Sequence, residues 1–387
     1  MIYFRTVKSF YSKDFRLGIL GGGQLGRMLI QEAVNLDIRV AVLDPSPDAP
    51  CSKIAHEFIC GDFMDFQTVI EFGKKVDVLT IEIEHVNVDA LDELVSLGKK
   101  VYPEPSFLRM VQDKGLQKEF FEKNHIATAS FFLVQTREDL LKLNSPTPFI
   151  QKLRRGGYDG KGVLAIRSAE SLQKESFDAP SVIEEMINFE KEIAVIIARN
   201  VSGEVKTFPL VEMEFNAEAN LVEFLFSPAN VSDVIEKEAI RLAHLIVEKT
   251  EFIGLLAVEM FVTKNGEVLV NEMAPRPHNS GHHTIEACPT SQYAQHLRAI
   301  LNLPLGDTAL LLPSVMINLL GEKGFSGPVV YSGLTEALAT PGVFIHLYGK
   351  SDTRPFRKMG HVTITDINPS LAHSKARQIA CLIKVVS

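Results

Sequence analysis

The sequence predicts a mixed α/β and α+β fold in three parts, and two patterns support this prediction. Short apolar strands alternate with helices from residue 16 to about residue 105, which is typical of a doubly wound α/β domain. Farther along the chain, strands outnumber helices and are separated by turn sequences, which favours antiparallel pairing. We therefore expect an extension over 1–15, an α/β domain over 16–111, a central domain over 112–302 and a small β-rich domain over 303–387.

Composition limits the class of protein. Of the 387 residues, 46% are hydrophobic and 23% are charged, and no apolar run reaches 18 residues, so neither disorder nor a membrane span is expected. The formal net charge of -8 argues against broad binding to nucleic acid. The four cysteines form no C-x-x-C pair and residues 1–16 lack the apolar core of a signal peptide, which predicts reduced thiols and a cytoplasmic location.

The first part carries the α/β alternation. Arg16–Leu20 is an apolar strand that runs into glycines, Met28–Leu36 has helical periodicity, and Arg39–Leu43 is a second strand that ends at Asp44. The pattern continues with strands near 55–60 and 76–83 and helices near 66–75 and 88–97. Pro103 and Pro105 mark the expected end of this domain.

The central part begins with a predicted helix over 112–124 and a small antiparallel lid over about 125–190. The lid strands are expected near 148–152, 162–166 and 181–186. Beyond the lid we expect strands at 192–199, 206–211, 221–226, 255–262 and 267–273, and helices at 233–248 and 291–301. After Pro304 the chain again becomes rich in strands.

The first glycine loop, Gly21-x-Gly23-x-x-Gly26, follows a strand and opens a helix, and Asp44 lies about 20 residues farther on. This spacing fits a Rossmann-like dinucleotide site, so a nicotinamide cofactor is one interpretation. A helix N-terminus preceded by glycines also binds other phosphates or carboxylates, and the loop can equally be a purely structural turn. Gln24 and Leu25 lie at its crest.

The second glycine loop spans residues 151–162 and holds four cations and four glycines. It is not a Walker A loop, because Gly162 and a strand follow Lys161 where that motif needs Ser or Thr and a helix. We expect a hairpin flap that closes over phosphates, and the alternative is an exposed basic hairpin without a ligand. Lys152, on the strand that enters the loop, is the predicted partner of an inner phosphate.

A pair of carboxylates is predicted from a hairpin. Asn265-Gly266 is a strong signal for a two-residue turn between two strands. In that register Lys264 faces Glu267, Phe261 faces Val270 and Glu259 faces Glu272. Opposed carboxylates repel each other unless they share a proton, water screens them, or a cation lies between them. Because their neighbours are apolar, we expect Mg²⁺, with Mn²⁺ as an alternative, and hence a nucleoside triphosphate.

Polar loops around this hairpin supply further candidates. Arg276 is placed to hold an anion, whereas His278 and His282 are spaced like a zinc pair that Pro277 and Gly281 disfavour. Glu184, Glu185 and Glu192 suit adenine and ribose recognition, although simple surface acidity gives the same pattern. The basic loop over 348–361 is a candidate phosphate clamp, and the alternative is a solvated turn.

Six motifs together resemble one known family. They are Gly-Gly-Gly-Gln-Leu-Gly (21–26), Glu82-Ile-Glu84-His-Val, Gln112-Asp-Lys114, Gly-Gly-Tyr-Asp-Gly-Lys-Gly (156–162), Asn-Glu-Met-Ala-Pro-Arg-Pro-His-Asn-Ser-Gly-His (271–282) and Tyr-Gly-Lys with Arg-Lys-Met-Gly-His (348–361). From about residue 16 to about residue 365 the chain resembles the N5-carboxyaminoimidazole ribonucleotide synthetases of the ATP-grasp superfamily. The resemblance implies an ATP-grasp fold with a Rossmann-like pre-ATP-grasp domain and a β-rich C-terminal domain.

The implied reaction converts ATP, bicarbonate and 5-aminoimidazole ribonucleotide into N5-carboxyaminoimidazole ribonucleotide, ADP and phosphate through carboxyphosphate, in purine biosynthesis. The resemblance further implies a homodimer whose product passes to a mutase. Three other hypotheses are a sister ligase acting on another ribonucleotide such as glycinamide ribonucleotide, a nicotinamide-dependent dehydrogenase, and a nucleotide-binding sensor without turnover.

The resemblance also assigns residues. Glu259 and Glu272 are the implied metal ligands, and Asp159, Tyr158 and Arg276 the catalytic residues. The implied ATP-binding residues are Lys114, Lys152, Gly157, Tyr158, Asp159, Gly160, Lys161, Gly162, Val163, Glu184, Glu185, Met186, Ile187, Glu192, Phe215, Asn271 and Glu272. The implied ribonucleotide contacts are Gln24, Leu25, Glu82, Tyr158, Asp159, Arg276, His278, Lys350 and Arg357. Two positions depart from the family pattern, since Phe215 stands where a histidine is usual and Phe356 where a glycine is commoner.

Overall fold

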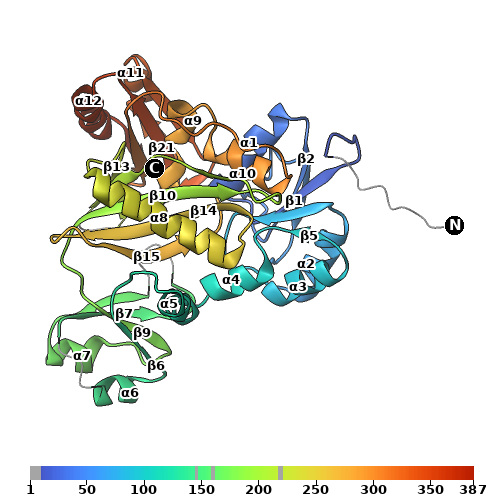
Figure 1. Cartoon of the computed structure of the whole chain (residues 1–387). Coiled ribbons are helices and arrows are strands. Elements are labelled where there is room, and N and C mark those ends of the chain that lie inside the picture. The colour runs from blue at the N-terminus through green and yellow to red at the C-terminus, as the bar shows by residue number, and fades with distance from the viewer. Residues whose placement is uncertain (1–9, 144–146, 158–161, 217–220) are drawn as a thin grey trace.

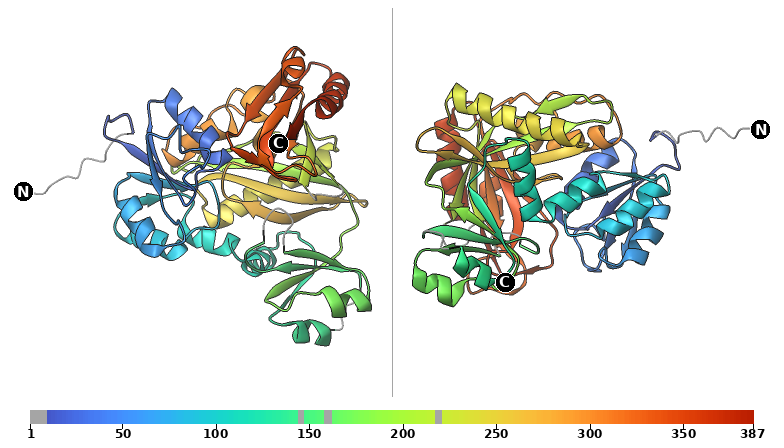
Figure 2. Two further views of the ribbon diagram at one scale, coloured as in Figure 1. Left: turned by 180° about the vertical axis from the view of Figure 1, so that it is seen from behind. Right: turned by 60° about the horizontal axis from the view of Figure 1, so that its bottom comes forward.

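The chain folds around three main sheets (Figure 1). A computed structural model describes residues 10–143, 147–157, 162–216 and 221–387. The parallel N-terminal sheet and the small antiparallel sheet lie apart, and the helices α4 (Pro105–Val111) and α5 (Lys114–Lys123) lie between them, as both Figure 1 and Figure 2 show. The third and largest sheet borders both, so residues from all parts can meet along it.

The N-terminal sheet is a five-stranded parallel sheet in the order β3-β2-β1-β4-β5. The chain leaves β1 toward β2 on one side and later returns to β4 on the other, so β1 and β4 flank the topological switch point where such folds bind ligands. Its strands are β1 (Arg16–Leu20), β2 (Arg39–Asp44), β3 (Glu57–Cys60), β4 (Val78–Ile81) and β5 (Lys100–Val101), and its helices are α1 (Gln24–Asn35), α2 (Phe66–Lys74) and α3 (Val88–Ser96).

The small sheet is antiparallel, in the order β6-β9-β7-β8. Its strands are β6 (Phe131–Val134), β7 (Phe149–Leu153), β8 (Val163–Ile166) and β9 (Ser181–Glu185), and the helices α6 (Arg137–Lys142) and α7 (Ala169–Glu175) connect them. The buried side chains of Val134, Leu140, Phe149, Ile166 and Ile183 form its own hydrophobic core.

The largest sheet has nine strands in the order β15-β14-β10-β12-β13-β16-β21-β19, and β11 pairs with β10. It continues from the central part into the C-terminal part through the antiparallel β13/β16 pair, so the predicted C-terminal part shares a sheet with the centre. The strands are β10 (Phe189–Arg199), β11 (Val205–Thr207), β12 (Val211–Asn216), β13 (Leu221–Ser227), β14 (Gly254–Thr263), β15 (Val268–Ala274), β16 (Ser314–Leu320), β19 (Val343–Leu347) and β21 (Lys358–Thr365).

Helices cover both faces of this sheet. α8 (Asp233–Thr250) buries its apolar side chains against β10 and β14, and α10 (Gln292–Ile300) packs against β14 and against α1 of the N-terminal sheet. The remaining elements are α9 (Thr284–Ala287), a 3₁₀ turn at Asn279–Gly281, α11 (Leu334–Leu338), α12 (Pro369–Leu382) and the short strands β17 (Gly327–Pro328), β18 (Val330–Ser332), β20 (Asp352–Thr353) and β22 (Lys384–Val386). Within the described residues, no helix combines the length and the apolar character that a membrane span requires.

The turn of the β14–β15 hairpin differs from the predicted one. The Thr263 N–H donates to the Glu267 carbonyl over 2.9 Å, so three residues rather than two form the loop, with Gly266 at a φ of 83°. Near the turn Phe261 lies opposite Leu269. The predicted pairs Lys264/Glu267 and Phe261/Val270 are therefore wrong, because a glycine in the left-handed conformation stabilises the longer loop.

A β-bulge then restores the predicted register farther from the turn. Met260 pairs with Val270 and Glu259 pairs with Glu272, which leaves Asn271 as the extra residue on β15. The opposition of Glu259 and Glu272 is confirmed. The bulge also sets Asn271 apart from the regular strand, directly beside one of the two carboxylates.

Candidate active site

The two opposed carboxylates differ in their surroundings. Glu272 receives an ion pair from Lys114 of α5, with Nζ 2.6 Å from Oε2 and 43% of the glutamate side chain exposed. The Glu259 side chain is 15% exposed, and the His278 ring approaches it, with Nε2 3.6 Å from Oε1. Burial, together with the charges of Glu272 and Glu192, raises the pKa of Glu259, whereas Lys114 lowers the pKa of Glu272. One proton therefore resides preferentially on Glu259.

A ring of hydrogen bonds links the small sheet to this hairpin. Lys152 of β7 donates to Asn271 Oδ1 and pairs with Glu184 Oε2 of β9, both over 2.8 Å. The second oxygen of Glu184 pairs with Lys118 of α5 over 3.1 Å. Lys118 in turn donates to Thr128 Oγ1 over 2.6 Å, and that hydroxyl donates to the Val270 carbonyl over 2.7 Å. The ring thus returns to β15 next to Asn271.

Lys118 belongs to this site but is absent from the residues predicted from the sequence. The spacing of the lysines could have indicated it, because Lys114 and Lys118 are four residues apart and share one face of α5. Lys118 is 2% exposed, which sets it apart from the lysines on the molecular surface. Burial lowers its pKa to about 8, and Glu184 opposes that effect.

The predicted adenine and ribose region lies along β9, β10 and β12. Glu185 closes β9 and accepts from Ser130 Oγ over 3.1 Å, while Met186 and Ile187 follow the strand. Glu192 pairs with Phe261 of β14, so it shares a face with Glu259, and burial raises its pKa to about 7. Phe215 of β12 packs beside Met213, which gives this position an apolar surface in place of a hydrogen-bonding group.

The tip of the predicted flap falls outside the described residues. This applies to Tyr158, Asp159, Gly160 and Lys161. On either side of it, Lys152 pairs with Val163 across β7 and β8, and Leu153 N–H donates to the Gly162 carbonyl over 2.8 Å. Gly157 and Gly162 therefore stand where the two strands converge on the tip, and Gly162 has a φ of 75°.

The first glycine loop holds a carboxylate from its own chain. The backbone N–H groups of Leu25 and Gly26 both donate to Glu82 Oε2 over 3.1 Å, and the Gly22 N–H donates to Asp44 Oδ2 over 2.7 Å. Glu82 thus occupies the anion position at the N-terminus of α1 that a dinucleotide pyrophosphate would need. The nicotinamide interpretation of this loop loses its main support. Gln24 is the first residue of α1, and Leu25 is buried beneath it.

Replacing Gly23 with alanine should destabilise this loop. The φ of -77° at Gly23 suits any residue, so backbone conformation does not require glycine here. A Cβ at Gly23 would, however, lie 2.6 Å from Glu82 Oε1, so the restriction is steric. We expect Gly23→Ala to lower the free energy of unfolding by about 2 kcal/mol, measured by urea denaturation. The double variant Gly23→Ala/Glu82→Ala should lose less than the sum of the two single variants; strict additivity would contradict the contact.

Arg276 and His278 connect the metal side of the site with the N-terminal domain. Arg276 Nη2 lies 2.7 Å from Glu84 Oε1, just past β4, and the positive charge of Arg276 also acts on Glu82. His278 Nδ1 accepts from the Ser280 N–H over 3.3 Å, which directs Nε2 toward Glu259. His282 is instead buried and its Nδ1 lies 3.1 Å from both Gln292 and Tyr293, so the two histidines do not form a zinc pair.

The C-terminal basic loop lies beside α1 of the N-terminal domain. Lys350 Nζ donates to the Lys358 carbonyl over 2.7 Å and lies 5.6 Å from the centre of the Tyr348 ring. Arg357 Nη1 donates to the Asp352 carbonyl over 2.6 Å. A Cβ at Gly349 would lie 3.3 Å from Arg27 Nη1 of α1, so this loop borders the helix that carries Gln24 and Leu25.

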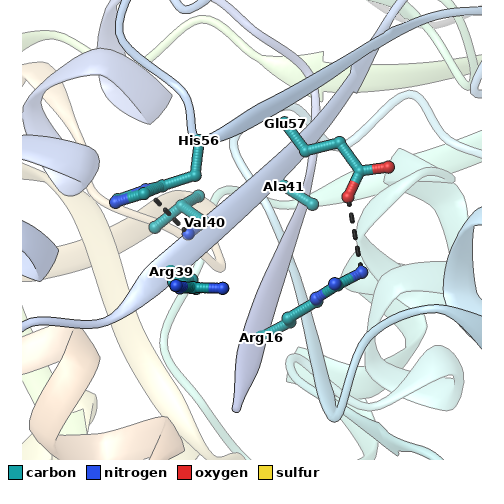
Figure 3. Close-up of a pocket in the computed structure, with 6 residues that line it drawn as sticks. All are labelled: Arg16, Arg39, Val40, Ala41, His56 and Glu57. Carbon is teal, nitrogen blue, oxygen red and sulfur yellow. Dashed lines mark hydrogen bonds and ion pairs between the residues drawn. The ribbon is translucent and has the colours of Figure 1, made fainter. Parts of the chain in front are cut away.

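A separate cavity of about 210 Å³ lies at the opposite end of the strands of the parallel sheet (Figure 3). It is at the N-terminal ends of β1 and β2, whereas the glycine loop, Asp44 and Glu82 follow the C-terminal ends of the strands. It is lined by Arg16, Arg39, Val40, Ala41, His56 and Glu57. This cavity is not part of the site assembled above.

The fold and the site define a class. A parallel N-terminal domain, a small antiparallel sheet and a large sheet whose hairpin presents two opposed carboxylates, one of them paired with a lysine, are the parts of an ATP-grasp protein. Family models agree: the ribonucleotide synthetase preATP-grasp domain matches residues 15–112, the ATP-grasp domain 119–293, and the phosphoribosylaminoimidazole carboxylase C-terminal domain 314–375.

Similar proteins narrow the class to a family. The chain is 36% identical to the N5-carboxyaminoimidazole ribonucleotide synthase of Bacillus subtilis over 90% of each chain. The crystal structure of the synthetase from Thermotoga maritima has 43% identity and a TM-score of 0.89, covering 96% of this chain and 99% of that one. The Aspergillus clavatus enzyme, solved with ADP and 5-aminoimidazole ribonucleotide, has 33% identity and a TM-score of 0.87, covering 95% and 98%. The chain belongs to the N5-carboxyaminoimidazole ribonucleotide synthase family.

Some relatives are longer. The chain spans 63% of the length of the chloroplastic phosphoribosylaminoimidazole carboxylase of Vigna aconitifolia, with 40% identity, and 65% of the length of the Saccharomyces cerevisiae enzyme, with 39% identity.

Proposed function

We propose that this protein carboxylates 5-aminoimidazole ribonucleotide, using ATP and bicarbonate, and releases N5-carboxyaminoimidazole ribonucleotide, ADP and phosphate. The observation that carries the proposal is the forced opposition of Glu259 and Glu272 beside Lys114, with Lys152 held at the neighbouring Asn271. Two opposed acids, one of them paired with a lysine, form a site for a metal–triphosphate complex. The names of the relatives support the choice of ribonucleotide.

Magnesium, or manganese in its place, is the metal that these residues fit. Glu259 and Glu272 are hard oxygen donors, and among the described residues no three or more His, Cys, Asp or Glu side chains are arranged to enclose an ion. Glu259 and Glu272 are the residues that would hold the metal. When bound, the metal would offset the negative charge on the phosphates.

The chemistry makes bicarbonate reactive before it meets the amine. A bicarbonate oxygen attacks the γ-phosphorus of ATP, the bond to the β–γ bridging oxygen breaks, and carboxyphosphate and ADP result. The exocyclic amine of the ribonucleotide then attacks the carboxyl carbon, directly or after release of CO₂, and phosphate and a proton leave. In this proposal Lys114 and Lys152, which pair with Glu272 and Glu184, stabilise the charge on the phosphoryl oxygens.

The remaining predicted residues take positioning roles in this proposal. Glu185, Met186, Ile187 and Glu192 bind adenosine, and Phe215 contributes only apolar contact. Glu184 acts on the nucleotide only through the two lysines that it holds. Glu82, Arg276 and His278, with Gln24 and Leu25, hold the aminoimidazole and ribose, and Lys350 and Arg357 hold the 5′-phosphate. Tyr158, Asp159, Gly160 and Lys161 lie outside the described residues and keep the roles expected from the sequence, all four at ATP and Tyr158 and Asp159 also at the ribonucleotide.

The assembly and location are also proposals. We propose a homodimer, which light scattering after gel filtration tests directly, and transfer of the product to a mutase. All four cysteines are free, which supports a reducing compartment such as the cytoplasm.

A phosphate-release assay tests the function. With ATP and Mg²⁺ present, we expect rapid release only when both 5-aminoimidazole ribonucleotide and bicarbonate are added, together with formation of the carboxylated product. Equal release with glycinamide ribonucleotide would assign the protein to a sister ligase. ATP binding without release under any combination would indicate a nucleotide sensor and overturn the proposal.

The Lys350→Ala variant tests the phosphate clamp. Its ammonium group donates to the Lys358 carbonyl and lies 5.6 Å from the centre of the Tyr348 ring, and these contacts order the side chain. We expect the KM for the ribonucleotide to rise about tenfold, with little change in the KM for ATP, in steady-state kinetics. An unchanged KM for the ribonucleotide would remove Lys350 from the clamp.

A further inference from the structure

One carboxylate in the site is shared by two lysines. Both oxygens of Glu184 are engaged, Oε1 by Lys118 over 3.1 Å and Oε2 by Lys152 over 2.8 Å. All three side chains are buried, with 5% of Glu184, 3% of Lys118 and 11% of Lys152 exposed. Burial alone would raise the pKa of Glu184, but the two lysines outweigh it and lower the pKa. The group is therefore a buried anion between two cations.

The two lysines have different second partners. Lys152 also donates to Asn271, at the bulge next to the metal-side carboxylate Glu272, so it faces the proposed triphosphate site. Lys118 also donates to Thr128, whose hydroxyl is fixed to the Val270 carbonyl. Lys118 is thus tied to the framework, whereas Lys152 lies at the edge of the site.

A buried carboxylate that loses its counter-ion is strongly destabilised. If Lys152 turns toward a phosphate oxygen, Glu184 needs another cation. Lys118 is already in contact and remains there. Although burial lowers its pKa to about 8, Lys118 still carries its charge at neutral pH.

We propose that Lys118 is a positioning residue, the permanent counter-ion of Glu184, and that its presence allows Lys152 to exchange Glu184 for a phosphate oxygen of the nucleotide. This inference rests on the proposed use of ATP. Lys118 does not touch the nucleotide and acts only through Glu184. Without it, Lys152 is the single cation available to a buried anion and stays bound there, so the triphosphate loses a ligand.

The test compares nucleotide binding in four proteins by isothermal titration calorimetry with Mg²⁺ and ATP. Lys118→Met should weaken ATP binding about tenfold, while the KM for the ribonucleotide stays near that of the wild type. Adding Glu184→Gln to Lys118→Met should restore much of the affinity, because a neutral amide no longer retains Lys152. Lys174→Met is the matched control, since Lys174 forms an exposed pair with Glu170 on α7.

The double variant separates positioning from simple loss of structure. A general packing role for Lys118 would make the double variant as weak as, or weaker than, Lys118→Met, and that result would overturn the inference, as would unchanged ATP affinity in Lys118→Met. If Lys118→Met does not fold, Lys118→Arg, which keeps the charge, should bind ATP better than Lys118→Gln at equal melting temperature; equal binding would reject the role. Failure of the wild-type protein to bind ATP would instead reject the proposed function.

Discussion

Replacing Glu272 with glutamine is expected to lower kcat/KM for ATP about 10³-fold. The neutral amide removes a charged oxygen donor from the proposed metal site and also breaks the 2.6 Å ion pair that holds Lys114 in place. Folding should be retained, because the amide keeps the shape of the carboxylate. The measurement is phosphate release over a series of Mg²⁺ concentrations, together with the melting temperature.

Glu238→Gln is the matched control for this variant. Glu238 lies on α8 and pairs with Arg241 at the surface, so the same chemical change there should leave activity at the wild-type value. Full activity of Glu272→Gln at low Mg²⁺ would contradict the assignment of this carboxylate. A collapse of the melting temperature would show instead that the pair stabilises the fold.

Glu259→Gln should change the pH dependence of stability in metal-free protein. Burial first, and then Glu272 and Glu192, raises the pKa of Glu259 from 4.5 to about 8. Between these values the folded state binds more protons than the unfolded state, so stability falls as pH rises through this window. With a chelator present, the wild-type melting temperature should fall across the window more steeply than that of Glu259→Gln. Parallel curves for the two proteins would disprove the shift.

The sequence predicted the strand pairing of the carboxylates better than it predicted the turn. Asn265-Gly266 indicates a two-residue loop, but Gly266 stabilises a three-residue loop instead, which shifts the pairs near the turn by one residue. The bulge at Asn271 shifts them back, so Glu259 still meets Glu272. The three-residue loop and the bulge each depend on the backbone conformation of a single residue. The pattern of hydrophobic residues in the sequence therefore does not reveal them.

Proline positions show a second limit. Pro103 and Pro105 indicate the end of a domain, yet Pro105 is the first residue of α4, and Pro369 is likewise the first residue of α12. Proline suits that position because its missing N–H has no partner there in any case. Neither helix was predicted from the sequence.

Tertiary contacts set the third limit. Nothing in the sequence places Glu82 against the glycine loop, since the two segments meet only when β4 pairs with β1. The structure shows why glycine is commoner at one of the two departing positions: Phe356 has a φ of 62°, a left-handed conformation that favours glycine. The sequence identifies Phe356 as an unusual residue, but its backbone conformation is known only from the structure.

Replacing Lys152 with methionine should have the second largest effect, a rise of about 100-fold in the dissociation constant of ATP. Methionine keeps most of the length of the side chain but loses the ammonium that bridges Glu184 and Asn271 at the edge of the site. Lys118 still neutralises Glu184, so the protein should remain folded while a phosphate ligand is lost.

Calorimetry with Mg²⁺ and ATP measures this dissociation constant, and Lys142→Met, at an exposed pair with Glu138, is the control. Lys152→Arg should recover part of the affinity because it restores the charge. If Lys152→Met bound ATP as tightly as the wild type, Lys152 would be a structural link between β7 and β15 and not a ligand of the nucleotide.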